Sequence, residues 1–200
     1  GIKKLEMVEI ILDKSQDDEP QKIFESINST GLDLSLADLI RNYLLMDDEN
    51  QDELYENYWA EVEKNVGYRN LGDFVINFLN SQISKAVNSK NAYQLFKEHC
   101  QVNQLSHEDV LKMLKRTSRY YGAFIGENDY SNNVTVYLRA FYTIKQTTVL
   151  PLVFKIFDDF DEKHIDEKNL CKVLDYLLTY YVRITACEIN KNLSKFMKSM

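Results

Sequence analysis

The sequence predicts a mainly α-helical protein, in which a multi-helix domain follows a lone strand and two further helices. Apolar residues recur three and four positions apart over most of the chain, which is the spacing of a buried helix face. The 200 residues include only 6 Gly and 2 Pro, so there are few points at which a helix must end. The 13 Tyr and 10 Phe supply large side chains, and a chain of this length can bury a sizeable core.

The first element that we expect is a strand over residues 5–12. Apolar and polar residues alternate at the start of this segment, and it ends in a run that contains β-branched residues. An isolated strand leaves its backbone groups unpaired, and no second convincing strand follows. We therefore expect the chain to begin inside a truncated α/β domain. Residues 1–46 are interpreted as the end of that domain, and residues 47–200 as an all-helical domain.

The next segment reads as a helix, a polar turn and a second helix. Ile23, Phe24 and Ile27 form a helical stripe, and the turn at residues 28–31 ends in a glycine that can adopt a left-handed conformation. Ser35 is expected to begin the second helix by accepting a hydrogen bond from the amide of Asp38. The apolar face of the second helix comprises Leu36, Leu39, Ile40, Tyr43 and Leu44.

Helices are expected over most of the remaining chain. The predicted stretches are residues 54–66, 71–87, 93–100, 106–126, 134–142, 147–160, 166–182 and 188–200. Ser106 and Asp109 form an approximate capping box, and Pro151 falls in a first helical turn, where it is tolerated. Residues 134–138 have strand-like composition, but a strand there would lack a partner, so we predict a helix. The stripe of the helix after Asp166 comprises Leu170, Val173, Leu174, Leu177, Leu178, Tyr181 and Val182.

Composition limits the function classes. The net charge of −7, from 24 basic and 31 acidic residues, argues against nucleic-acid binding over the whole surface but leaves room for a local basic patch. The three cysteines lie far apart, which favours reduced thiols in a cytoplasmic protein. No apolar stretch is long enough to cross a membrane, and no signal-peptide core is evident, so we expect no membrane contact.

Two sets of residues are candidates for binding phosphate groups. Two basic rows share helical faces and could hold successive DNA phosphates: Lys112, Lys115, Arg116 and Arg119 in one row, and Lys191, Lys195 and Lys198 in the other. A nucleotide or phosphate could bind at the polar turn, through Asn28, Ser29, Thr30 and Gly31 with Arg41. The structural alternatives are a solvated helix face for the basic rows, and helix caps with a surface Asp38–Arg41 bridge for the turn.

No catalytic residue or metal site is predicted. The three histidines, His99, His107 and His164, have neither the spacing of metal ligands nor that of a catalytic triad. No glycine-rich phosphate loop, nucleophile elbow or paired-cysteine motif occurs in the sequence.

The run IFESINSTGLDLSLADLIRNYLL, residues 23–45, resembles the end of the ParB/sulfiredoxin-like domain in GmrSD-type, modification-dependent restriction enzymes. Positions that match the family pattern are Ile23, Phe24, Asn28, Ser29, Gly31, Leu34, Ser35, Asp38, Leu39, Ile40, Arg41, Asn42, Tyr43 and Leu44. In that family a ParB-like domain carries an Asp-Gly-Gln-Gln-Arg motif linked to nucleotide hydrolysis, and a helical region leads to an HNH nuclease. This sequence contains neither motif.

The resemblance implies an internal, inactive portion of a phage-defence protein. The parent would be an NTP-dependent DNA endonuclease that uses a nucleoside triphosphate and Mg²⁺, whereas this portion would hold no cofactor of its own. Its partners would be the other domains of the same polypeptide and, through the parent, DNA. The helical portion would bind DNA or relay between the nucleotide-binding and nuclease domains. The alternative is a helical protein–protein adaptor without any nuclease context.

Overall fold

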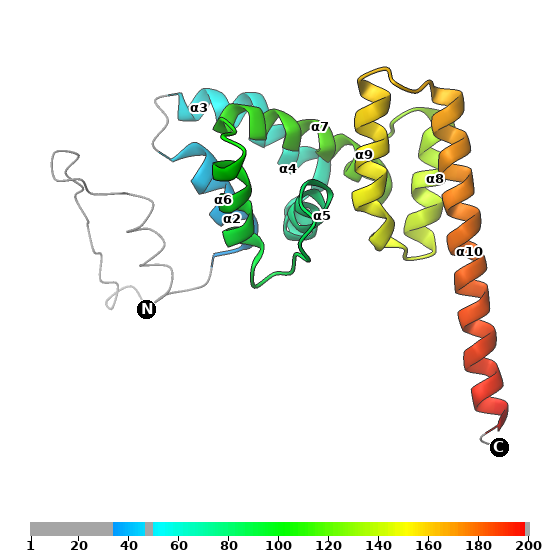
Figure 1. Ribbon diagram of the computed structural model, residues 1–200. Helices are drawn as coiled ribbons and strands as arrows, with labels where there is room; N and C mark the ends of the chain where they lie inside the picture. The colour runs from blue at the N-terminus through cyan, green and yellow to red at the C-terminus, as the bar shows by residue number, and fades with distance from the viewer. Residues whose placement is uncertain (1–33, 47–49, 199–200) are drawn as a thin grey trace, which may run out of the picture.

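The computed structural model describes residues 34–46 and 50–198, with side chains as far as residue 187. Within these ranges the chain is helical and contains no strand, as the sequence predicts (Figure 1). The helices are α2 (Leu36–Leu45), α3 (Gln51–Leu54), α4 (Ala60–Val66), α5 (Leu71–Gln82), α6 (Ala92–Val102), α7 (His107–Ile125), α8 (Asn132–Thr143), α9 (Leu150–Asp161) and α10 (Glu167–Lys198). The expected strand over residues 5–12 and the helix and turn over residues 23–31 lie outside the described residues.

The helices form two adjoining groups, which α7 and α5 connect. Helices α2 to α7 lie at one end of the molecule, and α8, α9 and α10 stand side by side at the other (Figure 1). The main contacts between the groups are those of α7 with α8 and of α5 with α9. Helix α10 packs mainly on α8 and then runs well beyond it (Figure 1).

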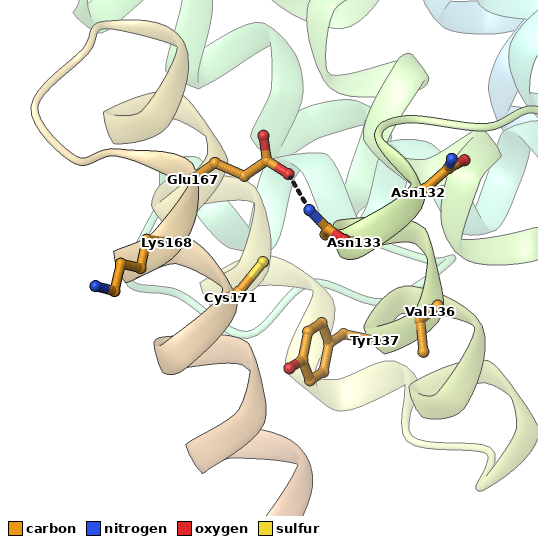
Figure 2. Close-up of a pocket in the computed structure, with 7 residues that line it drawn as sticks. All are labelled: Asn132, Asn133, Val136, Tyr137, Glu167, Lys168 and Cys171. Atoms are coloured by element: carbon orange, nitrogen blue, oxygen red, sulfur yellow. Dashed lines mark hydrogen bonds between the residues drawn. The ribbon is translucent and has the colours of Figure 1, made fainter.

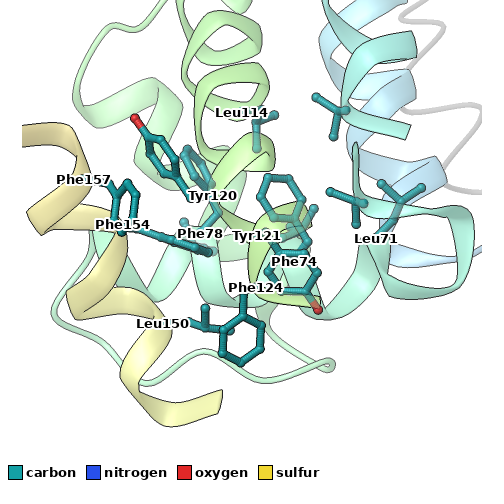
Figure 3. Close-up of a cluster of buried hydrophobic side chains, with 14 of the residues drawn as sticks. Leu71, Phe74, Phe78, Leu114, Tyr120, Tyr121, Phe124, Leu150, Phe154 and Phe157 are labelled. Atoms are coloured by element: carbon teal, nitrogen blue, oxygen red, sulfur yellow. The ribbon is translucent and has the colours of Figure 1, made fainter. Parts of the chain in front are cut away.

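Aromatic side chains from α5, α7 and α9 fill the core where the two groups meet (Figure 3). The ring centroids of Tyr120 and Phe157 are 4.7 Å apart, and those of Phe74 and Tyr121 are 5.5 Å apart in an edge-on arrangement. Such aromatic pairs add to the stabilisation that burial alone provides. The fully buried rings here include Phe74, Phe78, Tyr120, Phe124, Phe154 and Phe157. This core makes the two groups one packed unit.

Helix α2 belongs to the same core. Ile40 and Leu44 have no solvent exposure, and both are members of the cluster that contains the α5 and α7 rings. The side chain of Ser35 accepts a hydrogen bond from the amide of Asp38 at 3.2 Å, which confirms the predicted start of this helix. The second half of the 23–45 segment therefore packs against the other helices. The predicted domain boundary at residue 46 stays a prediction.

Helices α4 and α7 approach each other closely at Gly122. A Cβ atom at this position would lie 2.5 Å from the backbone oxygen of Asn65, a distance that real side chains do not adopt. A side-chain hydrogen bond also joins the two helices near this point, because Asn65 of α4 donates to Ser118 Oγ of α7 at 3.0 Å. Helix α7 ends at Ile125, next to Gly126, which is where the sequence predicts its end. Gly126 caps the helix in a left-handed conformation with a φ of +90°.

Several element boundaries differ from the sequence-based expectation. Helix α5 ends at Gln82 rather than near residue 87, because Ile83 is extended. Residues Tyr55–Trp59 form a π-helical turn between α3 and α4, which apolar spacing alone does not indicate. The predicted break before residue 188 was wrong: α10 is continuous from Glu167 to Lys198, and no Gly or Pro lies in that span to end it. Pro151 does lie in the first turn of α9.

Candidate functional site

Of the predicted nucleotide-binding residues, the structure describes one. Asn28, Ser29, Thr30 and Gly31 lie outside the described residues. Arg41 lies on α2, and its guanidinium group is 3.1 Å from a carboxylate oxygen of Asp38 and 3.5 Å from Glu63 of α4. The Asp38–Arg41 bridge is the one that the structural interpretation of the sequence anticipated. The role of the polar turn in phosphate binding stays a prediction.

Glu63 connects α2 with the π-helical turn. Its carboxylate accepts a hydrogen bond from Trp59 Nε1 at 2.8 Å and another from the Tyr55 hydroxyl at 3.0 Å, in addition to its contact with Arg41. Trp59 is 1% exposed, so its indole nitrogen depends on this partner. The π-helical turn shifts residues 55–59 relative to an α-helix, and the sequence gives no signal for this three-way junction.

The two cations at the start of the α7 row both have acidic partners. Lys112 lies 2.9 Å from Glu108, one turn earlier on the same helix. Lys115 lies 3.4 Å from Glu61 of α4 and donates to the backbone oxygen of Asn57 at 2.9 Å. Lys115 therefore fastens α7 to the segment that contains the π-helical turn.

The other two cations of the row face α9 and the loop before α8. Arg116 lies 2.9 Å from Asp158, although its Nε atom has no hydrogen-bond partner among the described residues. Burial raises the pKa of Asp158, and the Arg116 charge opposes that rise. Arg119 lies over the Tyr130 ring, 5.9 Å from its centroid. All four cations of the predicted α7 row thus have partners within the protein.

A second polar cluster lies next to this row and was missed from the sequence. Asp161, the last residue of α9, accepts hydrogen bonds from the hydroxyl groups of Tyr120 and Tyr130, the latter at 2.9 Å. Burial and the adjacent carboxylate raise the pKa of both tyrosines, so both phenols stay protonated and act as donors. Asp161 lies one residue beyond the helix predicted over residues 147–160, and the sequence carries no sign of this contact. The last turn of α9 therefore joins α7 to the α7–α8 loop.

An open groove lies between the first turns of α8 and α10 (Figure 2). Its volume is about 660 Å³. The Glu167 carboxylate accepts hydrogen bonds from Ser131 Oγ and Asn133 Nδ2, both at 3.1 Å, and so occupies the N-terminus of α8. The lining residues are Asn132, Asn133, Val136, Tyr137, Glu167, Lys168 and Cys171. An internal carboxylate therefore already lies beside the positive end of the α8 dipole.

A second, smaller groove lies beside α6 and has a volume of about 290 Å³. Its apolar wall is formed by Ile83, Leu95 and Val102, and Val102 is 80% exposed. Burial lowers the pKa of His99, which also lines this groove, so its imidazole is neutral at pH 7. Lys85 and Glu98 also line the groove, and their charged groups pair with each other at 3.7 Å. An apolar groove whose charges are paired suits contact with another protein better than contact with phosphate.

The remaining predicted cations lie at the end of the molecule. Lys191, Lys195 and Lys198 belong to the last turns of α10, for which the structure describes only the helical backbone. Over the described ranges, no group of three or more His, Cys, Asp and Glu side chains could hold a metal ion. None of the described helices could cross a membrane.

No protein-family model, curated protein or solved structure matches this chain.

Proposed function

We propose that this chain is a non-catalytic helical module of a GmrSD-like, modification-dependent restriction protein, and that it relays conformational changes between the nucleotide-binding and nuclease domains. The proposal starts from the resemblance carried by residues 23–45. Its structural support is the way in which α2, the second half of that segment, is joined to the rest of the helices.

The observation that carries the relay role is the junction at Glu63. Arg41 projects from the motif-bearing helix α2 to Glu63, which also holds buried Trp59 through a 2.8 Å hydrogen bond. The adjacent Lys115 extends the connection to α7 through Glu61 and Asn57. Close-packed helices joined in this way transmit displacement rather than absorb it. A movement of the segment before α2 would therefore reach α7.

The same contacts argue against DNA binding through the α7 row. A cation that is already paired must give up its partner before it can bind a phosphate. Lys112, Lys115 and Arg116 each have a carboxylate within 3.4 Å. Arg119 is the exception, because its partner is the uncharged ring of Tyr130. The pairing supports relay as the main role of this helix.

Two experiments test the proposal. The purified chain is expected neither to hydrolyse GTP nor to nick supercoiled DNA; either activity would refute its non-catalytic assignment. In the protein that also contains the nucleotide-binding and nuclease domains, Arg41→Ala is expected to reduce nucleotide-stimulated DNA cleavage while nucleotide affinity stays unchanged. Lys112→Ala, which removes only an ion pair within α7, is the control. Full nucleotide stimulation in the Arg41→Ala protein would contradict the relay role.

A second candidate function is that of a protein–protein adaptor. The observation in its favour is the apolar groove beside α6, where Val102 is exposed. If the chain is an adaptor, Val102→Glu abolishes capture of a partner protein, and the chain takes part in no nucleotide-stimulated DNA cleavage. If the chain is a relay, Val102→Glu leaves nucleotide-stimulated cleavage unchanged, whereas Arg41→Ala reduces it.

A further inference from the structure

The π-helical turn Tyr55–Trp59 places Leu54 in the core. Trp59, Val62 and Val66 form the buried side of the helix that follows, and each is at most 1% exposed. At 3.6 residues per turn, Leu54 would lie about 140° from Trp59 around an unbroken α-helix, on the side away from the core. In the structure Leu54 is only 7% exposed and belongs to the core cluster. The wider π-helical turn therefore rotates Leu54 inward.

An unbroken α-helix over residues 51–66 would bury Tyr55 instead of Leu54. Around such a helix, Tyr55 would lie about 40° from Trp59 and about 20° from Val62. Leu54 and Tyr55 are adjacent, and both carry a large apolar group, so either residue can fill the same place against the core. The apolar pattern thus fits two registers of this helix, and the structure shows the register that contains the π-helical turn.

Two side chains of α7 contact the π-helical turn. Lys115 donates to the backbone oxygen of Asn57, in the middle of the turn, at 2.9 Å, and it lies 5.7 Å from the centroid of the Tyr58 ring. Glu108 accepts a hydrogen bond from the Tyr58 hydroxyl at 2.8 Å. A hydrogen bond from a charged donor is stronger than one between neutral groups. Because the Lys115 bond is made to the backbone of the turn, it favours the π form directly.

Glu63 links the register of the turn to α2. Its carboxylate accepts a hydrogen bond from the Tyr55 hydroxyl at 3.0 Å and lies 3.5 Å from Arg41 of α2. If Tyr55 turned toward the core, its hydroxyl would leave Glu63, and the carboxylate would keep Arg41 and Trp59 as partners. The position of α2 and the register of the helix therefore depend on each other through this carboxylate.

From these features we propose that the π-helical turn is a two-state switch. In its second state residues 51–59 form an α-helix, Tyr55 replaces Leu54 in the core, and α3 turns by about 100° around its axis relative to α4. Lys115 holds the first state through the Asn57 oxygen. The switch supplies the two-state element that a relay needs, and in this role it rests on the function proposed above. The switch itself is a property of this chain alone.

The acceptor of the Ala60 amide tests the switch in the full chain. In the π form this N–H donates to the oxygen of Tyr55, five residues earlier, whereas in an α-helix it would donate to that of Glu56, four residues earlier. NMR scalar couplings across hydrogen bonds identify which oxygen accepts. Lys115→Met is expected to raise the ratio of the α form to the π form about tenfold, the effect of one hydrogen bond from a charged group, so that the Ala60–Glu56 coupling appears.

Three further variants serve as controls and as a reciprocal pair. Lys155→Met removes a lysine that donates to Gln82 Oε1 at 3.2 Å, on other helices, and it should leave the Ala60–Tyr55 coupling unchanged. Leu54→Lys puts a charge in the core of the π form only, so it is expected to give the α form. Tyr55→Lys puts the same charge in the core of the α form only, and it is expected to keep the π form. Trp59 fluorescence in urea establishes that each variant folds.

The outcomes separate the switch from the relay. If either Lys115→Met or Leu54→Lys retains only the Ala60–Tyr55 coupling, or loses both couplings because the turn unfolds, the switch is refuted. If both variants show the Ala60–Glu56 coupling while the Arg41→Ala protein keeps full nucleotide stimulation, the switch stands and only the relay is refuted.

Discussion

Replacement of Glu63 by alanine tests the junction between α2 and the π-helical turn. The substitution removes the acceptor for Trp59 Nε1, which lies 2.8 Å away on a side chain that is 1% exposed. A buried donor left without a partner costs about 1–3 kcal/mol. The Arg41 contact at 3.5 Å adds no more than about 1 kcal/mol, because its side chain is 32% exposed and that of Glu63 is 25% exposed. We expect a loss of about 2–3 kcal/mol in the free energy of unfolding.

Urea unfolding monitored by fluorescence measures this loss. Trp59 is the one tryptophan of the 200-residue chain, so its emission reports directly on the junction. Glu63→Gln keeps an acceptor for the indole and should recover more than half of the loss. Glu61→Ala, on the same helix, removes an exposed carboxylate and should cost less than about 0.5 kcal/mol. A cost for Glu63→Ala equal to that of Glu61→Ala would refute the reasoning.

Two further predictions concern the α4–α7 crossing and a buried thiol. Gly122→Ala is expected to lower the free energy of unfolding by more than about 2 kcal/mol, because its Cβ would meet the Asn65 backbone oxygen at 2.5 Å; urea unfolding within 0.5 kcal/mol of wild type would contradict this. Burial raises the pKa of Cys100 from 9.0 to about 11, so the folded chain keeps this thiol protonated where the unfolded chain ionises it. The buried, protonated thiol therefore contributes fully to the free energy of unfolding below pH 9, and this contribution is lost as the pH rises through about 11. At pH 9.5 Cys100 should react with a disulfide reagent far more slowly in the folded chain than in urea, and equal rates would contradict its burial.

The sequence predicts a helix correctly where the apolar spacing and the capping residues indicate the same boundaries. Helix α7 begins after Ser106 and ends at Gly126, as expected, because both signals are local and reinforce each other. Helix α8 formed despite the strand-like composition of residues 134–138, since Ser131 caps it and Val134 and Leu138 face the core. Tertiary packing there outweighs local propensity.

The interactions of the candidate sites could not be predicted in the same way. The α7 cations do lie on one face, but their partners Glu61 and Asp158 are distant in the sequence, so one helix could not reveal the pairing. The tyrosine partners of Asp161 are 41 and 31 residues away from it. Spacing rules describe one helix at a time, whereas these contacts depend on how three helices meet.

We expect Lys115 and Arg116 of α7 to join helices through Glu61 and Asp158 rather than to bind DNA. Fluorescence anisotropy of a labelled duplex, titrated at several salt concentrations with wild type and with Lys115→Ala/Arg116→Ala, distinguishes these two roles. We expect an unchanged DNA affinity and salt slope, together with a loss of about 1–2 kcal/mol in the free energy of unfolding. A weaker affinity with a salt slope reduced by about 0.9 for each lost phosphate contact, in a variant as stable as wild type, would contradict it.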